Sequence, residues 1–132
     1  MASFDVHGFT GLLEDLERLG RFDDIAPRMM EAGMDVLEES VKAESAKHYD
    51  TGAMTASIKR TGIEASYNGG FYMCTRPTGK DAKGVRNMEK MAYLEYGVKG
   101  RPATPVITRA VLNAEADTVV AMREVFEREI EK

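Results

Sequence analysis

The chain has 132 residues, with an apolar fraction of 43%, a charged fraction of 30% and a net charge of −4. These values predict one globular domain over residues 1–132 with a modest core, and they exclude a disordered or low-complexity protein. The overall acidity argues against specific nucleic-acid binding, because affinity for phosphates needs a basic face. No apolar run approaches the roughly 20 residues that span a bilayer, so no membrane association is expected.

The N-terminal residues have neither a basic patch nor an apolar run, so we expect no signal peptide and a protein that stays in the cytoplasm. The one cysteine, Cys74, cannot form an internal disulfide, and it has only His7 and His48 as company for a metal site. We interpret Cys74 as a small apolar residue on a strand. No metal, cofactor or catalytic residue is expected.

Two helices are predicted before residue 50. Apolar residues recur on one face between residues 8 and 19, so residues 1–20 should hold a short helical segment that ends at Gly20. A longer helix runs from there to about His48, with Asp23 or Asp24 as its cap and Pro27 in its first turn. Its buried stripe consists of Ile25, Met29, Ala32, Val36, Leu37 and Val41.

A β-hairpin follows a break in the helical pattern. The sequence Asp50-Thr51-Gly52 is typical of a turn, and residues 53–57 can form one helical turn. Residues 58–66 and 71–75 are predicted strands, joined by a turn around Gly69. Residues 76–88 have no apolar periodicity, and we interpret them as a mobile basic loop.

The last third of the chain returns to apolar patterns. Residues 88–98 predict a third strand, or a short helix that runs into one. On a strand, Tyr93 and Glu95 would share one face and Tyr96 would lie on the other. Thr104 is the expected cap of the final helix and Pro105 its first residue. The predicted fold class is α+β: a long N-terminal helix, a small antiparallel β-sheet with a long loop, and a long C-terminal helix.

Charge is distributed unevenly along the chain. Residues 76–101 contain seven basic and three acidic residues, a net charge of +4 that leaves −8 for the remainder. The basic residues are Arg76, Lys80, Lys83, Arg86, Lys90, Lys99 and Arg101. A basic central segment between acidic helices favours head-to-tail charge complementarity between copies. An ordinary solvated surface explains the same charges equally well.

Two motifs suggest chemistry without the context that it needs. Asp50-Thr51-Gly52-Ala53 is the active-site signature of dimeric retroviral-type aspartic proteases, but here no apolar strand leads into it. That enzyme remains the weaker alternative, with Asp50 as its catalytic group. The segment around Gly79 and Lys80 lacks the other positions of a phosphate-binding loop, so we interpret it as charged surface. Neither histidine has a nucleophile pattern beside it.

Three segments, in order, resemble the tail-completion (head–tail joining, or neck) family of long-tailed phages and prophages. Residues 51–58 resemble its Thr-Gly-x-Leu-x-x-Ser-Ile segment, although Met54 stands in place of leucine. Residues 91–97 resemble its Tyr-Ala-x-x-Val-Glu-(Phe/Tyr)-Gly segment. Residues 101–105, followed by Arg109 and Ala110, resemble its proline-led entry to the last helix. The matching motif residues are Thr51, Gly52, Ser57, Ile58, Gly97 and Pro105.

The resemblance implies a non-enzymatic virion structural protein. Such subunits form a ring, commonly six-fold, at the neck or the head-proximal end of the tail tube. The implied partners are further copies of the chain and neighbouring neck or tail proteins, in the virion and in the host bacterial cytoplasm during assembly. A tail terminator of the same region is an alternative. The expected assembly surface consists of Arg76, Lys80, Lys83, Arg86, Met88, Met91, Tyr93, Glu95, Tyr96 and Arg101.

Overall fold

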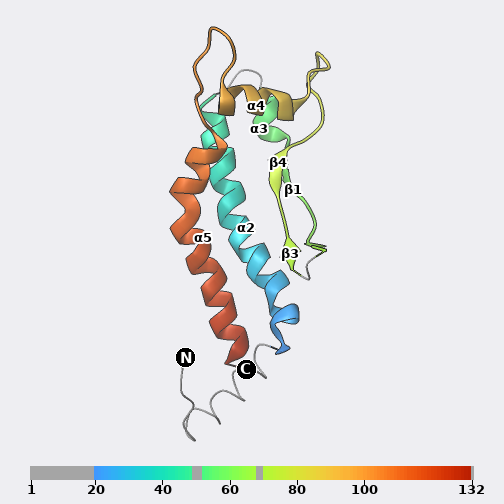
Figure 1. Cartoon of the computed structure of the whole chain (residues 1–132), viewed down its shortest axis with the longest axis vertical. Coiled ribbons are helices and arrows are strands. Elements are labelled where there is room, and N and C mark those ends of the chain that lie inside the picture. Colours follow the sequence, from blue (N-terminus) through green and yellow to red (C-terminus); the bar gives the residue numbers. More distant parts are fainter. Residues whose placement is uncertain (1–19, 49–51, 68–69, 132) are drawn as a thin grey trace, which may run out of the picture.

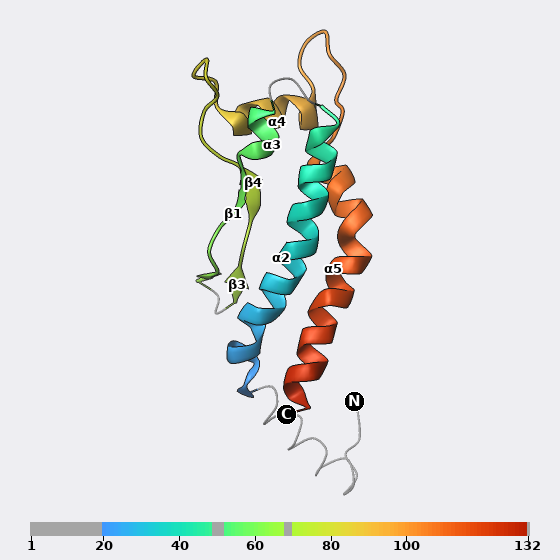
Figure 2. The same cartoon turned by 180° about the vertical axis from the view of Figure 1, so that it is seen from behind.

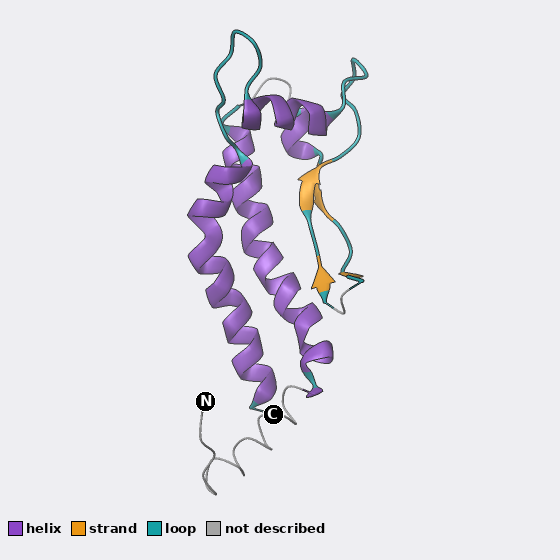
Figure 3. Ribbon diagram, in the orientation of Figure 1, coloured by secondary structure: helices purple, strands orange, loops and turns teal. Residues whose placement is uncertain are grey.

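The computed structural model describes residues 20–48, 52–67 and 70–131. Two long helices, α2 (Phe22–Ala46) and α5 (Ile107–Ile130), lie antiparallel along the length of the molecule (Figure 1). A narrow β-hairpin follows α2 on the side away from α5, so α2 forms the middle layer in both views (Figure 2). The short helix α3 (Ala53–Ala56) and the helix α4 (Asn87–Tyr96) lie across one end (Figure 3). The predicted α+β class is confirmed; the predicted helix over residues 8–19 lies outside the described residues.

Small residues bring the two long helices together. Ala110 and Ala114 are buried on α5, and the Ser40 hydroxyl donates to the Ala110 carbonyl oxygen over 2.8 Å. On α2, a Cβ atom added to Gly33 would lie 2.8 Å from Cγ of Met122. Larger residues at these positions would therefore force α2 and α5 apart.

The start of α2 differs from the prediction. The helix begins at Phe22, so Asp23 and Asp24 lie in its first turn and neither caps it with a side-chain hydrogen bond. Their carboxylates are still favourable there, because the helix N-terminus carries partial positive charge. Pro27 consequently falls inside the helix, in its second turn.

The core is concentrated at the end of the molecule where α3 and α4 lie against the last turns of α2 and the start of α5. Its buried residues come from α2, α3, β1, α4 and the start of α5: Val41, Met54, Ile58, Met91, Val106 and Ala110. Leu37, Met88, Leu94 and Ile107 pack around this cluster. Because each element contributes only one or two of these residues, none of the short elements can bury its apolar face alone.

The predicted hairpin is present, but its first strand contains a bulge that the apolar pattern does not indicate. Strand β1 (Ile58–Arg60) pairs with β4 (Thr75–Pro77), and β2 (Glu64–Ala65) pairs with β3 (Phe71–Tyr72). The Thr61 amide donates to the Cys74 carbonyl, while Glu64 pairs with Tyr72. Two residues, 62 and 63, therefore lie opposite residue 73 alone, which is the geometry of a β-bulge.

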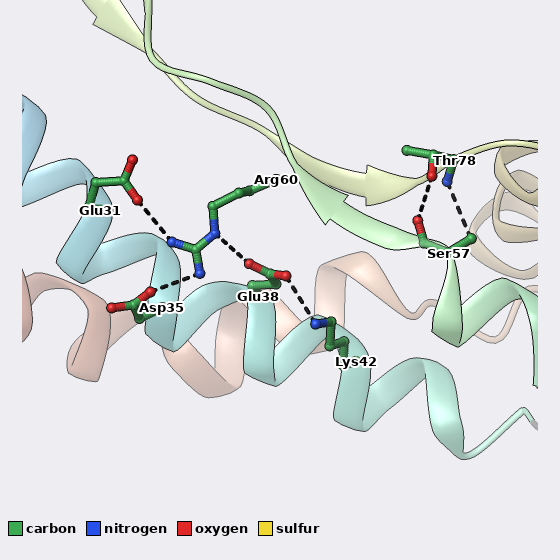
Figure 4. A network of polar contacts seen from close by, with 7 residues as sticks. All are labelled: Glu31, Asp35, Glu38, Lys42, Ser57, Arg60 and Thr78. Atoms are coloured by element: carbon green, nitrogen blue, oxygen red, sulfur yellow. Dashed lines mark hydrogen bonds and ion pairs between the residues drawn. The ribbon is translucent and has the colours of Figure 1, made fainter.

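Arg60 of β1 links the hairpin to α2 through ion pairs (Figure 4). Its guanidinium contacts Glu38 at 2.6 Å, Asp35 at 2.8 Å and Glu31 at 3.0 Å. The three carboxylates recur along one face of α2 and would repel one another without the cation. The hydrogen bonds that Arg60 donates to these carboxylates, that to Glu38 first, raise the pKa of Arg60, so it stays charged.

Residues 88–96 form a helix and no strand, which decides the alternative left open by the sequence. Tyr93 and Tyr96 are therefore three residues apart on a helix and share one of its faces, whereas Glu95 lies on a different face. The final helix starts at Ile107 after Val106, so neither Thr104 nor Pro105 has its predicted role. Glu95 supplies the missing cap, as described below.

Candidate assembly interface

The predicted assembly residues gather mainly at the end of the molecule that α4 closes. Two loops, residues 78–86 and 97–105, extend past α4 on its two sides (Figure 1). They carry Lys80, Lys83, Arg86 and Arg101, all exposed. Within the described residues, none of these four side chains has an ion pair. We call this surface the basic end.

Asp81 organises the first loop. Its carboxylate accepts the amides of Lys83 and Val85, each at 2.9 Å, and forms an ion pair with Lys90 of α4 at 2.5 Å. The hydrogen bond from Lys90, followed by that from the Val85 amide, lowers the pKa of Asp81. The loop thus returns to α4 with its cations outward. The predicted loop over residues 76–88 is shorter than expected, because residues 76 and 77 belong to β4 and residues 87 and 88 to α4. Its predicted mobility stays a prediction.

Ser57 and Thr78 join this loop to the start of the hairpin. The Thr78 amide and hydroxyl both donate to the Ser57 carbonyl, at 3.0 Å and 2.7 Å (Figure 4). The buried Asn87 side chain donates to the Thr78 carbonyl at 2.8 Å. These contacts fix where the loop leaves β4 and where α4 begins.

Glu95 links α4 to α5. Its carboxylate accepts the amides of Val106 at 2.9 Å, Ile107 at 2.8 Å and Thr108 at 3.2 Å, and the Thr108 hydroxyl donates to it as well. Burial alone would raise the pKa of Glu95, but these hydrogen bonds outweigh it and lower the pKa. A charged residue from another helix therefore satisfies the free amides at the start of α5.

The second loop depends on Gly97. Its φ of 77° and ψ of 169° belong to a region that glycine alone populates readily. A Cβ atom there would lie 2.8 Å from the Ala103 amide nitrogen. Beyond it, Val98 and Arg101 exchange both backbone hydrogen bonds around a two-residue turn at Lys99 and Gly100. This turn presents Lys99 and Arg101 to the solvent.

The structure divides the predicted assembly residues into four groups. Tyr93 and Tyr96 are exposed on α4, next to the cations of the basic end. Met91 is fully buried and Met88 packs on the same core, which corrects the expectation that this pair forms a surface. Glu95 is a helix cap. Arg76 lies apart, on the exposed face of β4.

The motif residues that carry the resemblance are structural. Gly52 has a φ of 80° and starts α3, Ser57 ends it, and Ile58 is buried in the core. Pro105 lies just before α5, and Thr51 falls outside the described residues. The motif residues that the structure describes thus form part of the scaffold of the basic end.

A cavity of about 520 Å³ opens beside α4 at this same end. Its walls are His48, Gly52, Met54, Thr55, Lys90, Tyr93, Leu94, Val98, Arg101, Pro102 and Thr104. Few of these residues could be assigned a function from the sequence, because they come from α3, α4, the second loop and the residues just after α2 and just before α3, which only the fold brings together. The mixed lining suits an apolar side chain with a neighbouring acidic group.

No group of three or more His, Cys, Asp or Glu side chains is placed to bind a metal ion among residues 20–48, 52–67 and 70–131. Over the same residues, no helix has the length and apolar character to cross a membrane. Asp50, the candidate protease residue, lies outside them, and Cys74 is a free, exposed thiol between β3 and β4. Comparison with known proteins gives no matching family model, curated protein or solved structure.

Proposed function

We propose that this chain is a non-enzymatic virion structural protein that joins phage heads to tails. The observation that carries the proposal is the convergence of the three family-like segments. Residues 52–58 are distant in sequence from residues 91–97 and 101–105, yet these segments build α3, the end of α4 and the second loop at one end of the molecule. A shared surface is what an assembly subunit needs.

The basic end is the surface we assign to the neighbouring neck or tail protein. Its cations are exposed on two loops: Asp81 accepts two backbone amides in the first, and the second starts at Gly97, which has a positive φ. Tyr93 and Tyr96 add aromatic surface between the loops. Tyrosine and arginine are enriched at protein interfaces. An acidic partner surface would complement them.

Charge reversal in the first loop tests this assignment. Deleting residues 78–86 would also remove Thr78 and Asp81, which hold the scaffold. We therefore choose the triple variant Lys80→Glu, Lys83→Glu and Arg86→Glu, which leaves those contacts in place. Arg128→Glu, which changes an exposed cation at the opposite end of α5, is the control.

The assay is complementation of a phage or prophage in which this gene is disrupted. Disruption should give filled heads and separate tails in electron micrographs, and the wild-type chain and Arg128→Glu should restore joined particles. The loop variant should fold normally by circular dichroism and fail to restore joined particles.

Normal particles without the gene would overturn the proposed function. Normal particles with the loop variant would overturn the assignment of the basic end. Immunogold labelling at the neck, as opposed to the tail end alone, would separate a joining protein from a tail terminator.

A further inference from the structure

Apolar side chains form much of the wall of the cavity beside α4. They are Met54 of α3, Leu94 of α4, and Val98 and Pro102 of the second loop. The volume of about 520 Å³ lies within the range of ligand pockets, roughly 300–1,000 Å³. One large apolar side chain and the residue next to it can therefore enter the cavity together.

The end of the cavity beside the first half of α4 already holds its own carboxylates. Lys90, which lines the cavity, forms an ion pair with Asp81 at 2.5 Å. Glu89, the residue before it, accepts a hydrogen bond from the Tyr93 hydroxyl. Two carboxylates thus accompany one cation, so this end does not attract a further anion.

Arg101 gives the other end of the cavity the opposite charge. The Thr104 amide donates to the Leu94 carbonyl at 2.8 Å, which holds the second loop against the last turn of α4. Arg101 lines the cavity and is exposed, and within the described residues it has no ion pair. Glu95, the acidic residue of this helix turn, is bound to the amides at the start of α5. No Asp or Glu occurs among the described residues of the lining, so a carboxylate is the group that would pair with Arg101.

We infer that the cavity receives a protein segment in which a large apolar side chain adjoins a carboxylate. The apolar side chain packs against Met54 and Leu94, and the carboxylate binds the Arg101 guanidinium. The inference rests on the proposed function and deepens it, because it states how the neighbouring neck or tail protein is recognised at the basic end. An apolar anchor in a pocket, surrounded by polar contacts, is the usual form of an interface hot spot.

The charges of the first loop favour a protein over a small organic acid as the occupant. A small acid in the cavity would pair with Arg101 alone. It would leave three exposed cations at the same end of the molecule without a partner: Lys80, Lys83 and Arg86. An acidic protein surface around the anchoring side chain would meet all of them.

Selection from a displayed library of random peptides, each about twelve residues long, tests the inference without the natural partner. Peptides that bind the wild-type chain should share a large apolar residue beside an aspartate or glutamate. Fluorescence anisotropy then gives the Kd of the strongest peptide for matched variants. Arg101→Glu should raise Kd at least about tenfold. Lys99→Glu, on the same turn but outside the cavity lining, should raise it less than about threefold.

A second pair of variants tests the apolar part of the site. Val98→Trp places a bulky ring in the cavity and should raise Kd at least about tenfold. Val85→Trp, at an exposed valine of the first loop outside the lining, should leave Kd within about threefold of the wild type. Circular dichroism establishes that all four variants fold.

Four results would overturn the inference: selected peptides without the apolar–acidic pair, equal Kd for Arg101→Glu and Lys99→Glu, unchanged binding by Val98→Trp, or octanoate that binds as tightly as the peptide. The last result would assign the cavity to a small acid. The proposed function fails separately. Peptides that bind as expected, together with normal particles when the gene is disrupted, would count against the proposed function alone.

Discussion

Replacing Arg60 by methionine should loosen the hairpin from α2 while keeping most of the apolar stem in place. The variant removes the cation that contacts Glu31, Asp35 and Glu38. Lys42 continues to pair with Glu38 at 3.0 Å, so one carboxylate keeps a partner. The loss should therefore be partial and measurable, without abolishing the fold.

The magnitude follows from how well each contact is shielded. The side chains of Arg60 and Glu38 expose only 29% and 13% of their surface, and a charge-assisted hydrogen bond of this kind contributes about 1.5–3 kcal/mol. Glu31 and Asp35 are more open, at 51% and 71%, so each adds about 0.2–0.5 kcal/mol at most. We expect Arg60→Met to lower the free energy of unfolding by about 2 kcal/mol and Tm by roughly 6–10 °C.

Urea unfolding followed by circular dichroism, at low micromolar concentration, measures this difference. Lys59→Met is the matched control, because it removes a cation from the neighbouring position of the same strand where no ion pair exists among the described residues. It should change stability by less than about 0.5 kcal/mol. If Arg60→Met were as stable as this control, the three carboxylate contacts would not hold the hairpin, and the reasoning would fail.

The effect should also depend on pH. Burial alone would raise the pKa of Glu38, but hydrogen bonds from Lys42 and Arg60 lower it overall. A carboxylate whose pKa is lowered by folding stabilises the protein above its unfolded pKa, about 4.3, and loses this contribution as the pH falls through the folded pKa. The stability gap between wild type and Arg60→Met should be full at pH 7 and shrink below about pH 4.

Three further substitutions test other parts of the fold by the same unfolding assay. Glu95→Ala removes the cap of α5 and should cost about 1–2 kcal/mol; no loss would mean that solvent serves the amides equally well. Gly97→Ala should cost more than about 2 kcal/mol, because strained backbone adds to the clash with Ala103, whereas Gly84→Ala has a φ of 82° but open space and should cost only about 1 kcal/mol. Equal costs for the two would show that the close approach at Gly97 is unimportant. Gly33→Val should cost about 1–3 kcal/mol by pushing Met122 away, and a stabilised variant would contradict the tight contact between α2 and α5.

The long elements were predictable because each repeats its own pattern many times. Helices α2 and α5 are 25 and 24 residues long, so a helical pattern repeats over several turns and single misplaced residues matter little. The ends of the helices were harder to predict. Asp23 is a good cap by type, yet the helix starts before it, since the chain continues to form helical hydrogen bonds from Arg21 onward.

The functional end was less predictable, because tertiary contacts build it. α4 has only Asn87 and Met91 buried, and two exposed tyrosines interrupt its pattern, so a strand was equally plausible. The cap of α5 comes from Glu95 on another helix, which local patterns cannot reveal. The bulge at residues 62 and 63 and the cavity beside α4 likewise depend on partners distant in sequence.

The Glu95 cap has a consequence for how the molecule opens. The amides of Val106, Ile107 and Thr108 lose their acceptor whenever α4 swings away, so fraying of α5 and release of α4 become one event. In hydrogen-exchange terms, these three amides should share one opening free energy with the α4 backbone, instead of exchanging freely like an ordinary helix end. A partner that binds α4 would then slow hydrogen exchange of the amides at the start of α5 without contacting α5.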